Sequence, residues 1–181
     1  MDTPHAPPSG ARKSKLFARV LDVAAVAVIV FAVWKIFIAP RVFVSKTAAL
    51  AAPPVVVPLQ SGGTFALQRA RGHVVFLDFW ASWCEPCKLS IPLIERYKAS
   101  HPDALVISVD AGEPVATASA YASRVKMKRV AFDPEMKVTE AFGVQVFPTM
   151  VVIDRDGKER AKWIGFNPAI ESAMTNAAAT F

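Results

Sequence analysis

VVFLDFWASWCEPCKLSIP, residues 74–92, begins as an apolar run and continues as a segment of helical character. Apart from Asp78, residues 74–80 are apolar, which is typical of a strand buried on both faces. Ala81 and Ser82 end that run. Pro86 suits the first turn of a helix, where its missing N–H does no harm. The stretch therefore predicts a strand, a turn and then a helix.

Cys84 and Cys87 are the two cysteines of this 181-residue chain. One helical turn separates them, so their sulfurs lie on the same side and close enough to form a disulfide. Unpaired N–H groups at a helix start favour negative charge, so we expect the pKa of the Cys84 thiol to fall below its usual value of about 8.5. Cys84 is therefore the expected nucleophile, and the more buried Cys87 resolves the mixed disulfide that forms.

The same stretch resembles the thioredoxin family, in which C-x-x-C follows a central strand. The matching residues are Asp78, Phe79, Trp80, Ala81, Trp83, Cys84, Pro86, Cys87, Lys88 and Pro92. The resemblance implies an α/β thioredoxin fold over residues 59–181, with a central mixed β-sheet flanked by helices. It also implies a thiol-disulfide oxidoreductase that uses no metal and no cofactor beyond the redox-active Cys84–Cys87 disulfide.

The resemblance assigns roles to further residues. Pro148 precedes the apolar run Met150–Ile153, and by resemblance it is a cis-proline that packs beside the cysteine pair. Asp78 is a carboxylate in an apolar strand, so burial should raise its pKa, and by resemblance it accepts a proton from Cys87. The candidate substrate-contacting residues are Trp83, Glu85, Pro86, Phe147 and Pro148.

An additional helix at 113–126 and a short strand at 130–132 are predicted between Cys87 and Pro148. This insertion resembles the membrane-anchored, extracytoplasmic TlpA and ResA group, which reduces disulfides in cytochrome c maturation or related assembly. Ser90 stands where that group usually has an acidic residue, and Val106–Ser108 lacks the lysine that thioredoxins place near the buried acid. We therefore expect proton handling to rest on Asp78 alone.

The basic charge of the chain is concentrated in its leader. The net charge is +6, and residues 1–58 hold seven basic and two acidic side chains, against fourteen and thirteen in the rest. No nucleic-acid signature accompanies this charge. Residues 20–39 are apolar except for Asp22 and Lys35, long enough to cross a bilayer as a helix.

Positive charges precede this apolar segment, which predicts a cytoplasmic amino end and an exported domain. We expect a cytoplasmic tail at 1–19, an uncleaved transmembrane anchor at 20–39, a linker at 40–58 and the thioredoxin-like domain at 59–181. The protein would then sit in the inner membrane as a single-pass protein, with its catalytic domain in the periplasm.

The expected partners are disulfide-containing client proteins, a membrane thiol-relay donor of the DsbD or CcdA kind, and membrane lipid around the anchor. An extracytoplasmic disulfide oxidase or isomerase is the main alternative. A copper-binding assembly chaperone is another, although His5, His73 and His101 show no ligand spacing with the cysteines. A redox-inactive interaction module would leave the cysteine pair and Pro148 unexplained.

Overall fold

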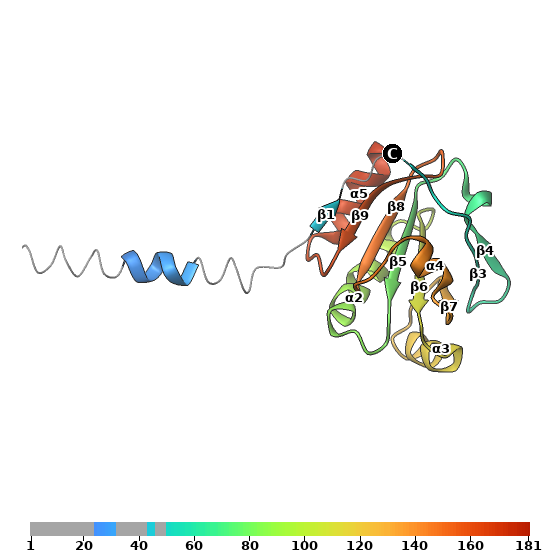
Figure 1. Cartoon of the computed structure of the whole chain (residues 1–181), viewed down its shortest axis with the longest axis horizontal. Helices are drawn as coiled ribbons and strands as arrows, with labels where there is room; N and C mark the ends of the chain where they lie inside the picture. The colour runs from blue at the N-terminus through green and yellow to red at the C-terminus, as the bar shows by residue number, and fades with distance from the viewer. Residues whose placement is uncertain (1–23, 32–42, 46–49) are drawn as a thin grey trace, which may run out of the picture. The chain divides into compact units, whose positions relative to one another are not determined.

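The computed structural model describes residues 24–31, 43–45 and 50–181 (Figure 1). Contacts divide the chain into two units, Met1–Ala39 and Pro40–Phe181. In the first unit, residues 24–31 form a helix with exposed side chains. None of the helices within the described ranges is long and apolar enough to cross a membrane. The predicted tail and most of the predicted anchor at 20–39 lie outside the described residues.

A mixed β-sheet forms the centre of the second unit. Its order is β1-β9-β8-β5-β6-β7, and β2 also pairs with β9. The central strand β5 pairs in parallel with β6 and antiparallel with β8, which confirms the predicted α/β fold with a mixed sheet (Figure 1). The strands are β1 (Phe43–Ser45), β2 (Leu50–Ala51), β5 (Val75–Trp80), β6 (Leu105–Ala111), β7 (Val130–Asp133), β8 (Thr149–Ile153) and β9 (Lys158–Ile164).

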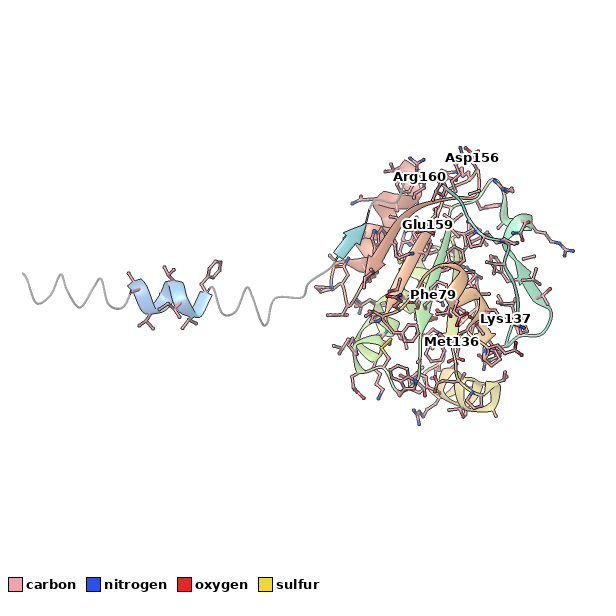
Figure 2. The ribbon with its side chains drawn as sticks, in the orientation of Figure 1. Phe79, Met136, Lys137, Asp156, Glu159 and Arg160 are labelled. Carbon is pink, nitrogen blue, oxygen red and sulfur yellow. A yellow bond between two sulfur atoms is a disulfide. The ribbon has the colours of Figure 1, made fainter. Side chains whose placement is uncertain are left out.

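Helices and a small hairpin cover the two faces of this sheet. On one face, Phe76 packs with Ile94 of α2 (Glu85–Ser100) and Met174 of α5 (Ile170–Thr180). The helix α3 (Val115–Arg124) packs on the same side, against Trp80. The opposite face carries the hairpin of β3 (Val56–Pro58) and β4 (Thr64–Ala66), with η2 (Leu67–Ala70) and α4 (Lys137–Ala141). Phe79 points toward this second layer, in the interior of the domain (Figure 2).

The domain begins earlier than residue 59, where the sequence placed its start. Val55 and Val57 are buried in the core, whereas Val56 between them is 65% exposed. This alternation is that of a strand with one buried face, and β3 pairs with β4. The part of the predicted linker from residue 50 onward is therefore folded into the domain.

The side chains of α2 divide into an exposed face and a buried face. Leu89 is 60% exposed, and the inward residues include Cys87, Ile91, Ile94 and Lys98. Their spacing of four, three and four residues follows the helical period and keeps them on one side. A lysine therefore shares the inward face of α2 with the second cysteine.

Candidate active site

The cysteine pair lies at the junction between the central strand and its helix. Cys84 is the N-cap residue of α2, and a disulfide joins it to Cys87 with their Cα atoms 5.2 Å apart. The backbone N–H of Cys87 donates to Sγ of Cys84 over 3.2 Å. Cys84 is 4% exposed and Cys87 is fully buried. Because N–H groups at the helix start stabilise a thiolate, the geometry suits Cys84 as the attacking sulfur and Cys87 as the resolving one.

An acidic residue holds the turn before Cys84. Both oxygens of Glu113 accept hydrogen bonds from Ser82, one from its backbone N–H and one from its hydroxyl, each 2.6 Å long. Glu113 also lies close to Asp110 at the end of β6. The pKa of Asp110 is raised to about 8, mainly by burial and further by the Glu113 carboxyl. Sequence reasoning missed Glu113, because its partner is 31 residues away and no local pattern links the two.

The proline predicted to be cis is cis. The Phe147-Pro148 peptide bond has this conformation, immediately before β8. Phe147 packs against the apolar cluster that contains both cysteines. The ring of Trp83 meets that of Phe147 edge-on at 5.9 Å and is itself 64% exposed. Trp83 and Phe147 therefore form an apolar surface beside the disulfide.

The remaining candidate contact residues face solvent on the first turn of α2. Glu85 and Pro86 are both exposed, and Pro86 occupies the second helical position. Glu85 pairs with Lys88 at 2.5 Å, so the opposite charges near Cys84 partly cancel. An exposed pair of this kind contributes little to stability.

Asp78 lies on the face of β5 that α2 covers, where it is 2% exposed. Side chains alternate along a strand, so Asp78 points to the same side as Phe76 and Trp80, toward α2. Burial raises its pKa to about 6, although Lys98 and a hydrogen bond from Ser108 act in the opposite direction. Asp78, Ser90 and Pro148 are among the residues that line a cavity of about 10 Å³. It is large enough for about one water molecule.

From the sequence we expected Asp78 to handle protons without a polar partner, and the structure corrects this expectation. Ser108 is its register partner on β6, and the hydroxyl of Ser108 donates to Oδ2 of Asp78 over 3.2 Å. Nζ of Lys98 donates to the Ser108 hydroxyl over 2.9 Å. Val106–Ser108 indeed contains no lysine, but α2 brings one to the same place. The helical period from Cys87 to Lys98 was the signal that could have found it.

His73 and His101, the two histidines in the described ranges, lie away from the cysteine pair. His101 follows the end of α2 and stacks on Tyr97 at 4.2 Å, and His73 precedes the start of β5. His5 is outside the described residues. In the part of the chain that the structure describes, no three His, Cys, Asp or Glu side chains gather as a metal site.

Comparisons with known proteins agree with this geometry. Residues 47–178 match the model of the family described as Redoxin. The thiol-disulfide oxidoreductase ResA of Bacillus thuringiensis (strain Al Hakam) is 34% identical over 119 residues, which cover 63% of this chain and 68% of that protein. The ResA of Geobacillus thermodenitrificans (strain NG80-2) is 33% identical over 122 residues, covering 64% and 70%.

A solved structure shares both fold and sequence with this chain. A crystal structure described as a thiol:disulfide interchange protein DsbE from Chlorobium tepidum superposes with a TM-score of 0.66 and 33% identity. The superposition covers 74% of this chain and 96% of that one.

Proposed function

The chain belongs to the Redoxin family, and from this premise and the geometry of its cysteine pair we propose that it reduces protein disulfides outside the cytoplasm. It is a thiol-disulfide oxidoreductase. The observation that carries the mechanism is the position of Cys84. Its sulfur caps α2 and accepts the Cys87 N–H, and Cys84 is the more exposed of the two residues.

Reduction of a client proceeds in two exchanges. First, the Cys84 thiolate attacks one sulfur of the client disulfide, so that a mixed disulfide forms and the other client sulfur leaves as a thiolate. Next, the Cys87 thiol gives its proton to the Asp78 carboxylate and attacks Sγ of Cys84. The Cys84–Cys87 disulfide closes, and the second client sulfur leaves with the electron pair. The client has gained two electrons, and the protein must be reduced again.

Each remaining candidate residue has a place in this scheme. Trp83 and Phe147 offer an apolar surface to the client chain. Pro148 follows Phe147 through a cis peptide bond and by resemblance contacts the client beside this surface. Glu85 and Pro86 lie on the exposed first turn, where a client segment passes Cys84. No metal and no further cofactor takes part in either exchange.

The reducing direction requires electrons from the cytoplasm, so we include the amino-terminal segment in the proposal. Residues 20–39 anchor the protein in the inner membrane, residues 1–19 remain in the cytoplasm and the catalytic domain works in the periplasm. The apolar composition of the segment and the basic residues before it support this arrangement. A membrane thiol-relay protein of the DsbD or CcdA kind then re-reduces the disulfide, and apocytochrome c or a related assembly protein is the client.

The reduction potential of the full chain tests this proposal first. Purified in detergent and equilibrated against glutathione, with alkylation to count free thiols, the chain should show a potential near about −270 mV, as thioredoxin does. A potential above about −180 mV would indicate an oxidase or isomerase instead.

Two cysteine variants test the assigned order of attack. With a disulfide-bonded peptide, the reduced Cys87→Ser variant should accumulate a mixed disulfide through Cys84, which mass spectrometry detects. The matched Cys84→Ser variant should accumulate none. Equal trapping by both variants would contradict the assignment of Cys84 as nucleophile.

A further inference from the structure

We propose that Lys98 is a positioning residue for disulfide exchange, which acts through the Ser108 hydroxyl on the carboxyl group of Asp78. The proposal rests on the acid–base role given to Asp78 above. It concerns a side chain that touches neither client nor cysteine and that comes from α2 rather than from the sheet. The neighbouring strand β6 supplies only the hydroxyl that connects the two charges.

The ammonium group of Lys98 is buried and fully hydrogen-bonded. Its side chain is 1% exposed, on the inward face of α2. Nζ donates to Oε1 of Glu95 over 2.7 Å, to Oγ of Ser108 over 2.9 Å and to the backbone carbonyl of Lys128 over 2.6 Å. An ammonium has three N–H donors, so these three acceptors use all of them. Burial lowers the pKa of Lys98, but this set of partners holds the charged form.

This arrangement fixes the direction of the next hydrogen bond. Because the Ser108 oxygen accepts from Lys98, its own hydrogen is directed to Oδ2 of Asp78, 3.2 Å away. A hydrogen bond donated to a carboxylate favours the ionised form, and so does a positive charge behind it. Burial raises the pKa of Asp78. Lys98 opposes this rise through its charge and through the direction that it gives to the Ser108 hydrogen bond.

Among the charged groups described around Asp78, Lys98 is the one that favours the ionised carboxylate. On α2, Glu95 carries a negative charge that disfavours the Asp78 carboxylate, and it is paired with Lys98. Arg129, just before β7, acts on Lys98 as a like charge, and its guanidinium donates to the carbonyls of Pro102 and Ala104. The cavity beside Asp78 is otherwise lined by uncharged residues, among them Ser90 of α2, Met150 of β8, Trp163 of β9 and Ile170 of α5.

The consequence concerns the second exchange step. Cys87 needs an ionised Asp78 to take its proton, and without Lys98 the Asp78 carboxyl would remain protonated to higher pH. A neighbouring opposite charge changes a carboxyl pKa by about one unit or more. If the pKa rises by one unit from about 6, the ionised fraction at pH 6 falls from about one half to about one tenth.

Titration of the Asp78 carboxyl by carbon NMR, in the full chain in detergent, tests the link without relying on activity. In Lys98→Met we expect the pKa of Asp78 to rise by about one unit. The midpoint of the pH profile for mixed-disulfide resolution should rise with it, and the rate at pH 6 should fall about fivefold. Ser108→Ala keeps the positive charge of Lys98, so it should raise the pKa of Asp78 and the midpoint of the pH profile by less than Lys98→Met does. Lys158→Met, at an exposed lysine of β9, is the matched control and should shift neither.

The Asp78→Asn background separates positioning from a merely structural role. There the Lys98→Met change should leave the pH profile unaltered, because no carboxyl remains to be positioned. A folded Lys98→Met protein with an unchanged Asp78 pKa would overturn the proposal, and so would a Ser108→Ala protein without any shift. If Asp78→Asn alone leaves the resolution rate unaltered while Lys98→Met still moves the Asp78 pKa, the acid–base role of Asp78 fails and the link to Lys98 stands.

Discussion

Replacing Asp78 by asparagine should make the oxidised protein more stable at neutral pH and less active. Asp78 is 2% exposed in an otherwise apolar strand, and its pKa is about 6 instead of 3.8. Each pKa unit corresponds to about 1.4 kcal/mol, so the ionised carboxylate lowers the free energy of unfolding at pH 7 by up to about 3 kcal/mol. Asparagine is nearly isosteric and never ionises, so Asp78→Asn should recover much of this free energy.

The direction of the pH dependence of stability follows from the number of protons bound in the folded and unfolded states. Because the pKa of Asp78 is raised in the folded state, the folded protein binds more protons than the unfolded chain between about pH 4 and pH 6. The wild type is therefore relatively most stable below about pH 4, loses stability as pH rises through this window and levels off above it. The asparagine variant lacks this fall, so its advantage should be small at pH 4 and largest above pH 6.

Equilibrium unfolding in urea at pH 4 and pH 7, followed by tryptophan fluorescence, measures the difference. Asp103→Asn, at an exposed aspartate, is the control and should change the free energy of unfolding by no more than about 0.5 kcal/mol at either pH. An Asp78→Asn protein without any gain at pH 7, or with an equal gain at pH 4, would refute the reasoning. In the same variant, resolution of the mixed disulfide should slow down, since Cys87 has lost its proton acceptor.

Glu113→Ala removes both hydrogen bonds that hold Ser82, and urea unfolding should show a loss of about 3 kcal/mol, whereas Glu140→Ala at an exposed site should change little. Equal effects of the two glutamate variants would contradict the stabilising role of the Glu113–Ser82 hydrogen bonds. Trp83→Ala removes the exposed ring beside the disulfide, and steady-state assays should show a KM for protein disulfides about three- to tenfold higher with unaltered thiol pKa values. An unchanged KM would mean that clients do not contact this surface. Met174→Ala empties a fully buried position between α5 and the sheet, and thermal or urea unfolding should show a loss of about 2–5 kcal/mol with unaltered exchange kinetics. A loss below about 1 kcal/mol would show that the surrounding core collapses around the gap.

Several parts of the site could be predicted because their signals are local. The apolar run of β5, the spacing of Cys84 and Cys87 and the proline at 86 indicate a strand, a turn and a helix start. These effects act over a few residues, through strand burial, helical period and unpaired N–H groups. The cis conformation of Pro148 followed from resemblance to a family rather than from any such local signal, and the structure confirms it.

Other features depended on contacts that no local pattern contains. Glu113 reaches Ser82 across 31 residues, and Val55 and Val57 belong to the core because β3 pairs with β4 against the second face of the sheet. The sequence alone favoured a linker there, since alanine, proline and valine are also typical of a tether.

The sequence by itself determined the redox chemistry, because the two sulfurs and the helix start that activates one of them lie within four residues. The surroundings of Asp78 were decided only by the tertiary structure. Helical period places Lys98 on the same face as Cys87, but it does not say which position of which strand that face covers. The packing of α2 over β5 and β6 sets that register, and it brings Lys98 to Ser108 and Asp78 from 10 and 20 residues away.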